Sequence, residues 1–404
     1  MQRNKFYVDV PILDVKADGR VSSPVKQRRA ILKFPLLLLG LLMTSLGSSH
    51  VDAGHLEVVR ELRVETGQGI TPYAIAQTHE GGYVVTGMSY GLPWATRVDA
   101  AGKVQWQHIL KIAELRPGGP STFYDGVAIL PDDSAVLCGF KIIEPNGVSG
   151  LLTHIDKTGQ AISERSLQPN VPGGTSALSY LQRCMPWGDG AAVVGHALRW
   201  FKPGQIPMNE ELTWVLALDS HADIKWEKLY PFDFGPEARA VVTSDGDLVT
   251  ESWGLRIITR IDPAGAVKNK SSLPAGLVRP IQPEAEIYAV SYPDSKMVLH
   301  QLGAQLEELG RVTGKAVTGF HNTSMYRMKD GALVLFGYQR GPENRAAVRW
   351  ISPDLNRQET LLLDPYWIVA DAIPTGSPGE FAVVSQGLKH PESPILVITL
   401  LRVK

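Results

Sequence analysis

Hydrophobic and polar positions alternate over short runs along most of the chain, and turn-forming residues separate these runs. In the first clear example, residues 80–87 give a tight turn and an apolar run, and residues 94–99 give an alternating run that ends at an aspartate. A third run continues through Trp106. Period-two alternation bounded by Gly and Asp is typical of short antiparallel strands. We therefore predict β-structure almost throughout; the most helix-like piece, residues 304–309, is short.

The same pattern recurs, with variations, about every 50 residues. A shift of 120 residues superimposes Trp94, Asp99 and Trp106 on Trp214, Asp219 and Trp226. Two further copies of the middle strand and its turn are residues 153–159 and 259–265. In each turn Asp can bond backbone N–H groups two residues on, and Gly tolerates the positive φ that closes the turn. Repetition at this period indicates a propeller or another stacked array.

The motif Gly-Gly-Tyr-Val-Val-x-Gly, followed by Asp-x-x-Gly-x-x-x-Trp, resembles the repeats of secreted bacterial β-propellers and, more loosely, those of quinoprotein-like propellers. The resemblance extends over nearly all of residues 55–404 and concerns structural positions. It implies an all-β fold of four-stranded antiparallel blades. Quinoprotein enzymes repeat the Trp turn in almost every blade, whereas here only residues 99–106 and 219–226 keep it. We therefore expect no cofactor.

Counting the turns that precede the second strand of each copy gives seven units, with six or eight as alternatives. Four of these turns follow a small residue at a similar distance, as crowding around an axis requires: Ala76, Ala128, Cys184 and Ala240. The last unit has three strands before Lys404, and residues 56–64 are predicted to supply the fourth. This closure would hide both terminal strands. We predict a seven-bladed β-propeller in a single domain, residues 54–404, closed by the N-terminal strand of the mature chain.

Residues 1–53 do not follow the repeat and are predicted to be a cleaved export signal. Arg28 and Arg29 precede an apolar run at residues 34–46, and a small-residue segment ends at Ala53. A helix of about 13 residues is near 20 Å long, whereas a bilayer core is ~30 Å thick, so a permanent anchor is not expected. Residues 27–33 also resemble the twin-arginine export motif. Both the Sec and the twin-arginine routes stay open, and either predicts a periplasmic or secreted protein.

Charge argues against one class of partner. Without residues 1–53 the chain has 32 basic and 37 acidic residues, a net charge of −5. Nucleic-acid binding requires a basic face, so nucleic acid is not an expected partner. The apolar fraction of 44% supports a packed core.

The two cysteines, Cys138 and Cys184, belong to neighbouring units. In an oxidising compartment they could form a disulfide. Alternatively, each is a small buried packing residue, since Cys184 takes a position that Ala occupies elsewhere. Their different places in the two units leave their separation undefined, and both interpretations stay open.

Three motifs resemble catalytic or metal sites but fit structural roles better. Residues 87–91 match Gly-x-Ser-x-Gly, yet another strand follows Ser89 where a nucleophile elbow requires a helix. The ten histidines include no His-Glu-x-x-His and no closely spaced pair, so zinc is not expected. Acidic residues at 132–133 and 245–247 coincide with the repeated hairpin turn, so calcium is not expected either.

The lengths of the connections predict one functional face. First-to-second and third-to-fourth strand connections are tight. The long ones are second-to-third connections at residues 141–150, 196–212, 339–345 and 388–394, and inter-unit connections at 111–123, 168–179 and 231–237. In up-and-down blades these two classes emerge on the same side, where function usually lies. Aromatic residues beside basic ones are typical of contact surfaces, and the predicted binding residues are Arg116, Arg199, Trp200, Phe201, Lys202, Tyr230, Phe232, Phe234 and Arg340. The alternative is that these aromatics fold down and cap the blades.

The first functional hypothesis is an exported binding or scaffold module that uses this loop face to hold a protein or an envelope component. The second is a propeller hydrolase or lyase with an axial site, for which the sequence supplies no matched acid, base and nucleophile. The third is a carbohydrate-binding module that stacks sugars on Trp200 and the aromatics of residues 230–234. A polar axial funnel with converging carboxylates or histidines would favour the enzyme, and a plugged axis with a broad apolar loop face would favour the binder.

Overall fold

The computed structural model describes residues 55–404 apart from 68, 111–121, 144–146, 172–174, 201–208, 232–238, 253–256, 273–279, 282–286, 292–295, 317–318, 364–365 and 388–394. These residues belong to one compact unit, His50–Lys404. The predicted export signal lies outside the described residues. Where the chain is described, its regular elements are strands, and no helix there is long and apolar enough to span a bilayer.

Five four-stranded antiparallel sheets are formed. One contains β2 (Thr71–Gln77), β3 (Tyr83–Ser89), β4 (Leu92–Val98) and β5 (Val104–Ile109). Another contains β14 (Arg239–Val242), β15 (Leu248–Ser252), β16 (Ile257–Ile261) and β17 (Val267–Ser272). The next contains β18 (Pro280–Ile281), β19 (Ile287–Ser291), β20 (Lys296–Leu302) and β21 (Glu308–Ala316). The next contains β22 (Phe320–Arg327), β23 (Leu333–Gln339), β24 (Arg345–Ile351) and β25 (Gln358–Leu362).

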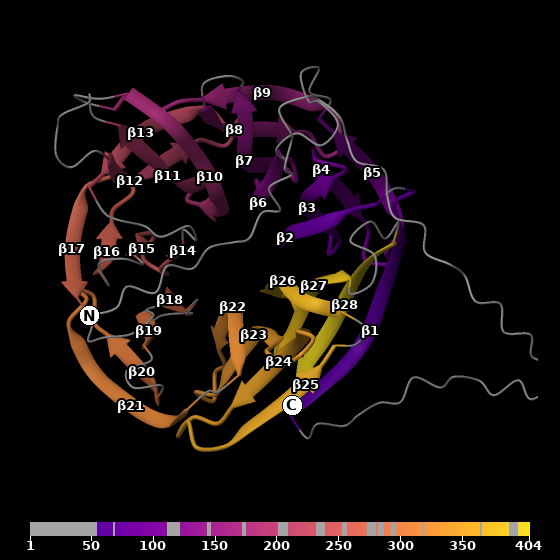
Figure 1. Ribbon diagram of the computed structural model, residues 1–404, viewed down its shortest axis with the longest axis vertical. Coiled ribbons are helices and arrows are strands. Elements are labelled where there is room, and N and C mark those ends of the chain that lie inside the picture. Colours follow the sequence, from indigo (N-terminus) through magenta and orange to yellow (C-terminus); the bar gives the residue numbers. More distant parts are fainter. Residues whose placement is uncertain are drawn as a thin grey trace, which may run out of the picture. The chain divides into compact units, whose positions relative to one another are not determined.

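The fifth four-stranded sheet joins the two ends of the described chain. It contains β26 (Tyr366–Pro374), β27 (Glu380–Gly387), β28 (Ile395–Val403) and, outermost, β1 (Leu56–Glu65). β1 pairs antiparallel with β28 from Leu56 opposite Val403 to Glu65 opposite Ile395, and the two strands lie side by side in Figure 1. The Lys404 N–H also donates to the His55 carbonyl at 2.9 Å. The outer strand of the last sheet therefore comes from the other end of the chain.

The remaining strands form one eight-stranded sheet. Its first half contains β6 (Phe123–Ile129), β7 (Ala135–Ile143), β8 (Gly147–Ile155) and β9 (Ala161–Leu167). Its second half contains β10 (Thr175–Trp187), β11 (Gly190–Trp200), β12 (Asn209–Leu218) and β13 (Ile224–Tyr230). Each half is antiparallel, and one parallel pair, Leu178 with Val148, joins them.

The prediction of seven separate four-stranded sheets is therefore wrong in that form, because the structure has five and an eight-stranded sheet. The physical reason is strand length. Two connections predicted to be long loops, residues 141–150 and 168–179, are partly strand, since β7 runs to Ile143, β8 begins at Gly147 and β10 begins at Thr175. The extended start of β10 reaches the edge of β8 and pairs with it once.

The sheets follow one another around a common centre, and the apolar cores lie between consecutive sheets (Figure 1). The cluster around Trp94, for example, combines Val85 from β3 with Leu62 from β1 and Ile398 from β28. It packs the first four-stranded sheet against the sheet that contains both chain ends. Burial of alternating aliphatic and aromatic residues on both sheet faces supplies the main stabilisation.

Outer strands also contact the third-to-fourth strand turn of the following unit. The indole of Trp106 in β5 donates to the Lys157 carbonyl at 3.2 Å, and the indole of Trp226 in β13 donates to the Pro263 carbonyl at 2.9 Å. Other donors make the corresponding contact in other units. The Asn269 side-chain amide donates to the Ala304 carbonyl at 3.4 Å, and the backbone N–H of Lys315 donates to the Leu355 carbonyl at 3.3 Å. The Asp-to-Trp spacing noted in the sequence thus serves contacts between units.

Candidate functional site

A cavity of about 320 Å³ lies among the innermost strands. Its walls come from β2, β6, β10, β14, β22 and β26, which are first strands of their four-stranded units. Its surface is polar and apolar in similar measure, and its apolar lining residues include Ile75, Val127, Met185, Met325 and Ile373. Small-molecule sites are usually concave, with a few placed polar groups that fix the ligand.

Five innermost strands carry a β-bulge at an equivalent position. The register shifts fall between Pro72 and Ala74, Tyr124 and Gly126, Leu181 and Arg183, Asn322 and Ser324, and Val369 and Asp371. A bulge bends its strand and re-aims the side chains that follow. The residue after each bulge lines the cavity: Ala74, Gly126, Arg183, Ser324 and Asp371.

The second strand of four of these units has a glycine beside the bulge. The residue before the bulge pairs with Gly87, Gly139, Gly195 or Gly337. A Cβ at Gly87 would collide with the carbonyl oxygen of Thr71 on the bulged strand, and one at Gly139 would collide with that of Phe123. The glycine that closes the Gly-Gly-Tyr-Val-Val-x-Gly motif is therefore required by the close approach of the inner strand.

The charged groups of the cavity come from opposite parts of the sequence. Nη1 of Arg183 in β10 lies 3.4 Å from Oδ2 of Asp371 in β26. The same oxygen accepts the backbone N–H of Ile75 at 3.3 Å, and Oδ1 accepts the Ser324 hydroxyl at 3.2 Å. Groups from three other strands, β10, β2 and β22, thus hold the Asp371 carboxylate in place. Its side chain is 9% exposed, whereas that of Arg183 is 32% exposed.

Burial and neighbouring charges shift the pKa values of ionisable groups in and beside the cavity. The Asp371 carboxylate raises the pKa of Arg183 above its ordinary value, outweighing burial, and Asp125 acts in the same direction. Burial raises the pKa of Tyr326, whose hydroxyl donates to the Ala372 carbonyl. Burial, with help from Asp125, raises the pKa of Tyr73 to about 12. Arg183 is therefore cationic, and both tyrosines are neutral, across the physiological range.

A row of aromatic rings runs across the starts of β2, β6 and β10. Ring centroids of Tyr73 and Phe123 are 4.5 Å apart, those of Phe123 and Phe140 are 4.4 Å apart, and those of Phe140 and Tyr180 are 4.9 Å apart. His196 continues the row, stacked on Tyr180 at 4.6 Å. Tilted and edge-on ring pairs at these distances are favourable and join three consecutive units.

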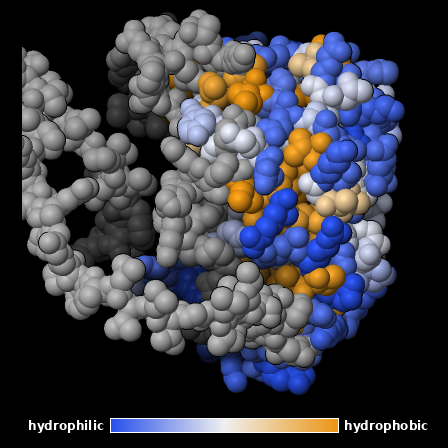
Figure 2. Space-filling view, turned by 90° about the vertical axis from the view of Figure 1, so that its right-hand side faces the viewer, coloured by the Kyte–Doolittle hydropathy of each residue, from blue (hydrophilic) through white to orange (hydrophobic). Residues whose placement is uncertain are grey.

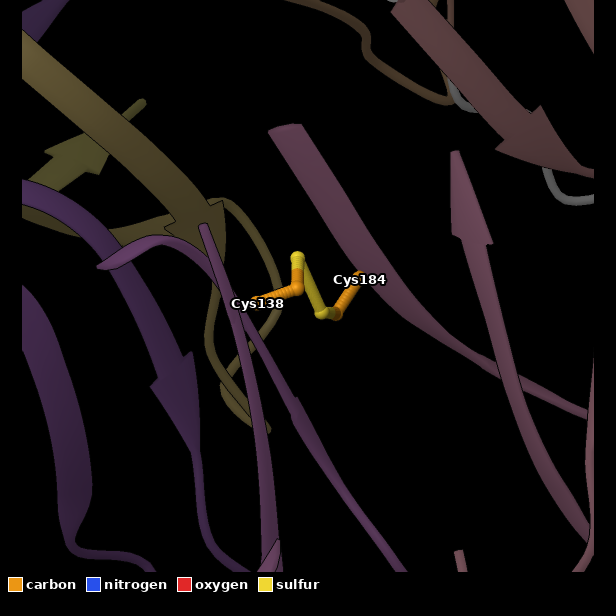
Figure 3. The surroundings of a disulfide bond; sticks show 2 residues. All are labelled: Cys138 and Cys184. Atoms are coloured by element: carbon orange, nitrogen blue, oxygen red, sulfur yellow. A yellow bond between two sulfur atoms is a disulfide. The ribbon is translucent and has the colours of Figure 1, made fainter. Parts of the chain in front are cut away.

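A disulfide crosses from β7 to β10 beside the charged pair. It links Cys138 and Cys184, whose Cα atoms are 6.3 Å apart (Figure 3). Cys184 follows Arg183 directly and lines the cavity. A Cβ at Gly126 would lie 2.8 Å from Cys138 Sγ and 2.7 Å from the Cys184 nitrogen, so glycine there leaves room for the bridge. Of the two interpretations that the sequence left open, the structure has the disulfide and not two separate thiols.

The structure describes the side chains of two predicted loop-face residues. Arg340 is exposed, and its backbone N–H donates to the Gly319 carbonyl at 2.6 Å. Tyr230 is buried, and its hydroxyl donates to the Gly265 carbonyl at 2.8 Å. The prediction that Tyr230 is an exposed contact residue is therefore wrong. Tyr230 fits the alternative, an aromatic that folds down and caps the blades, because its buried ring packs between two units.

The other seven predicted residues are not brought together by anything the structure describes. Arg199 and Trp200 are the last residues of β11 and pair with Glu210 and Asn209 of β12, so they lie in a strand rather than a loop. Five predicted residues lie outside the described ones: Arg116, Phe201, Lys202, Phe232 and Phe234.

The surface that the structure describes has no broad apolar patch in view. Figure 2 shows one side of the molecule, where hydrophobic residues are scattered among hydrophilic ones. Exposed large hydrophobic residues of the described chain, such as Tyr90, Ile162 and Leu309, come from different units. Single exposed hydrophobic residues are normal on a soluble surface and mark no interface.

Residues of the motifs that resemble catalytic or metal sites form hydrogen bonds and ion pairs within the fold. The Ser89 hydroxyl donates to the Gly69 carbonyl at 2.9 Å, beside the turn at Tyr90 and Gly91. Asp245 and Asp247 form ion pairs with Arg260. Among the described residues, no three His, Cys, Asp or Glu side chains are grouped to hold a metal ion.

Sequence reasoning missed Arg183 and Asp371 because it looked for function in loops. The sequence does contain a signal for them. Both are charged residues inside apolar runs that precede a turn, and charged residues are rare in such buried strands. Asp125 in the first half of the eight-stranded sheet has the same signature.

Comparisons with known proteins bear on the fold. No family model and no curated protein sequence matches the chain. Among solved structures, a streptogramin B lyase matches with a TM-score of 0.54 at 13% identity, covering 87% of this chain and 98% of the lyase. A catalytically inactive variant of virginiamycin B lyase from Staphylococcus aureus, with quinupristin, matches with a TM-score of 0.50 at 14% identity, covering 85% and 99%. The WD40 propeller domain of Doa1 has a TM-score of 0.45 at 11% identity, covering 86% and 97%. The chain is thus an all-β propeller with four-stranded antiparallel blades.

Proposed function

We propose that this propeller is an exported binding protein and that its binding site is the axial cavity at Arg183 and Asp371. The observation that carries the proposal is the set of aligned bulges, which brings a guanidinium and a carboxylate from different units to one cavity. A buried ion pair is weak evidence for stability, because desolvation offsets the Coulombic attraction. A pair that faces a cavity with a partly exposed guanidinium is better explained by a ligand.

The ring that supports this site is proposed to have seven blades, with the eight-stranded sheet counted as two, and to be closed by β1. Contacts from each outer strand to the next unit's turn support it, including one from β1: Nη2 of Arg60 lies 3.3 Å from the Ala101 carbonyl, in the turn of the β2–β5 sheet. The core that contains Leu62 and Trp94 supports the same closure.

Export is the second part of the proposal, with residues 1–53 as a cleaved signal and the mature protein periplasmic or secreted. The Cys138–Cys184 disulfide supports it, since stable disulfides belong to oxidising compartments. Cell fractionation followed by N-terminal sequencing of the recovered protein tests this part. We expect a start near Gly54; a full-length protein in the cytoplasm contradicts it.

The loop-face partner surface stays a prediction, and so do a protein or envelope partner and a carbohydrate ligand. An axial hydrolase or lyase is the alternative from another class. It needs a base that is free to accept a proton, whereas the Asp371 carboxylate in the cavity is held by Arg183, the Ile75 N–H and the Ser324 hydroxyl. Binding is therefore the function that the cavity supports better.

Ligand retention tests the axial site. The wild-type protein is incubated with a small-molecule extract of the envelope fraction, separated from free molecules, and analysed by mass spectrometry after denaturation. Arg183→Met removes the guanidinium and keeps the stem, whereas Arg402→Met removes a guanidinium of β28, away from the cavity, that pairs with Glu380 of β27. We expect a molecule that the wild type and Arg402→Met retain and Arg183→Met loses. Equal retention by all three proteins, or retention by none, contradicts the proposal.

A further inference from the structure

We propose that the axial ligand is a neutral polyhydroxyl molecule of the size of a single sugar ring, whose hydroxyl groups accept from Arg183 and donate to Asp371 and Ser324. This inference rests on the proposed axial binding function and names its class of ligand. It places a sugar-like ligand in the cavity rather than on the aromatic residues of the loop face.

The first step is the direction of the hydrogen bonds that the cavity offers. Within the described part of the chain, the Arg183 guanidinium has one ion-pair contact, from Nη1 to Asp371, and its side chain is partly exposed. A guanidinium has five N–H donors and no acceptor, so its other groups can only donate. The Asp371 carboxylate can only accept, and the Ser324 hydroxyl already donates its hydrogen to Asp371 at 3.2 Å, so the Ser324 oxygen accepts as well. A ligand must therefore accept on the Arg183 side and donate on the side of Asp371 and Ser324.

The second step is charge. Nη1 of Arg183 and Oδ2 of Asp371 are 3.4 Å apart, so the two side chains balance each other. A ligand carboxylate or phosphate would be repelled by Asp371, and a ligand ammonium would be repelled by Arg183. Either charge would enter the cavity against a pair that is already neutral, and an unbalanced buried charge is costly. A neutral ligand keeps the balance.

The third step is the kind of neutral group. A hydroxyl both donates and accepts, so it suits either side of the cavity and reproduces the hydrogen bonds of water. The cavity surface is polar and apolar in similar measure, and a sugar ring has the same character, with hydroxyls at its rim and C–H groups on its faces. A volume of about 320 Å³ is at the small end of ligand pockets, which favours a single ring over a chain of sugars.

Calorimetric titration of the wild-type protein with matched sugars tests this inference. The probes are D-glucose, D-galactose and D-mannose, each compared with its uronic acid, which has a carboxylate, and its 2-amino sugar, which has an ammonium. We expect at least one hexose to bind, and to bind at least roughly tenfold more tightly than both of its charged counterparts, the scale of one hydrogen bond to a charged group. Binding of no hexose, or equal or tighter binding of a charged counterpart, overturns the inference.

Two charge variants should reverse this preference. Arg183→Met leaves the Asp371 carboxylate without its cation, so the amino sugar should bind at least roughly tenfold more tightly than it does to the wild type. Asp371→Asn leaves the guanidinium without its anion, so the uronic acid should gain by a similar factor. Such a gain cannot come from a protein that has failed to fold. Folded variants, judged by thermal unfolding, that show no gain overturn the assignment of the contacts.

Ser324→Ala keeps both charges and decides the assignment even if neither charge variant folds. It removes one hydroxyl that lines the cavity, so it should weaken the bound hexose roughly fivefold. The matched control is Ser166→Ala, which removes an exposed hydroxyl of β9 outside the cavity and should leave hexose binding unchanged. Equal hexose binding by Ser324→Ala and Ser166→Ala overturns the assignment.

The failure of this inference and the failure of the proposed function give different results. If no hexose binds while the extract still yields a molecule that Arg183→Met loses, the polyhydroxyl class is wrong and the axial site stands. If no hexose binds and no molecule is retained, both fall.

Discussion

The indole N–H of Trp106 donates to the carbonyl of Lys157 across the boundary between two units of the propeller, at 3.2 Å. The ring also lies on Gly159, where an added Cβ would come within 2.6 Å of the Trp106 side chain. Trp226 makes the equivalent contact with the Pro263 carbonyl. The tryptophan at a fixed distance from an Asp-Gly turn therefore belongs to the packing of consecutive units.

Replacing Trp106 should destabilise the propeller in two steps. Trp106→Phe loses the hydrogen bond to the Lys157 carbonyl, at a cost of about 0.5–1.5 kcal/mol, because water can reach the exposed Lys157. Trp106→Ala also opens a cavity at a buried site and should cost about 3–5 kcal/mol. Trp226 is only partly buried, so Trp226→Ala is the milder control. Urea unfolding of the four proteins measures the differences; equal costs for the two alanine variants would contradict the packing role.

Gly87 and Gly376 offer a matched test of the bulge. Gly87→Ala places a Cβ against the carbonyl of Thr71, so the bulged strand must move, and we expect a loss of about 2–4 kcal/mol. Gly376→Ala adds a Cβ that meets nothing within 4 Å, at ordinary φ, and should change stability by less than about 0.5 kcal/mol. The midpoint of thermal unfolding gives both values. A tolerated Gly87→Ala would show that the inner strand is not pressed against the second strand.

The strands and turns could be predicted because their signals are local. Asp99 and Gly102 form their turn through bonds within four residues, with the Asp99 carboxylate accepting the Lys103 N–H at 2.9 Å. The role of residues 56–64 as the outer strand beside the last strand could also be predicted, because three strands without a fourth leave an open edge. Periodicity and turn chemistry suffice for these features.

The axial site could not be predicted in the same way. A bulge shifts the register by one residue, so simple alternation misassigns which side chains face the axis. Arg183 and Asp371 meet only through the order of units around the ring, since 188 positions separate them in the sequence. Tyr230 shows the converse error: an aromatic at the end of a strand looked exposed, and a neighbouring turn buries it. Tertiary contacts decide both cases.

Two residues of β1 test how far the propeller depends on this outer strand. Leu62 is 2% exposed and packs in the core with Trp94, whereas Val59, three residues earlier, is 37% exposed. Leu62→Ala should cost about 2–5 kcal/mol and Val59→Ala less than about 0.5 kcal/mol. Chemical unfolding measures both. If Leu62→Ala is also tolerated, β1 does not hold the two ends of the chain together.

The disulfide should contribute to stability by restricting the unfolded chain. Cys138 and Cys184 enclose a segment with a sequence separation of 46, for which the loss is typically about 2–4 kcal/mol. The double variant Cys138→Ala and Cys184→Ala should therefore unfold at lower denaturant concentration. The wild type in a reducing agent should approach the same midpoint, whereas the variant should not respond to reduction. A wild type that is insensitive to reductant under unfolding conditions contradicts this role.

His196 should make the propeller less stable in acid. Burial lowers its pKa from about 6.5 to about 4, so the folded state keeps the imidazole neutral while the unfolded state protonates first as pH falls. Stability is therefore full above pH 6.5 and is lost between pH 6.5 and pH 4, by up to about 3 kcal/mol from this residue. His196→Phe keeps a ring against Tyr180 and removes the titration. Burial also lowers the pKa values of His108 and His154, so the variant should reduce the slope of stability against pH in this window without abolishing it. Urea unfolding at pH 7.5, 5.5 and 4.5 measures the slope, and an identical slope in the two proteins would mean that His196 is not buried.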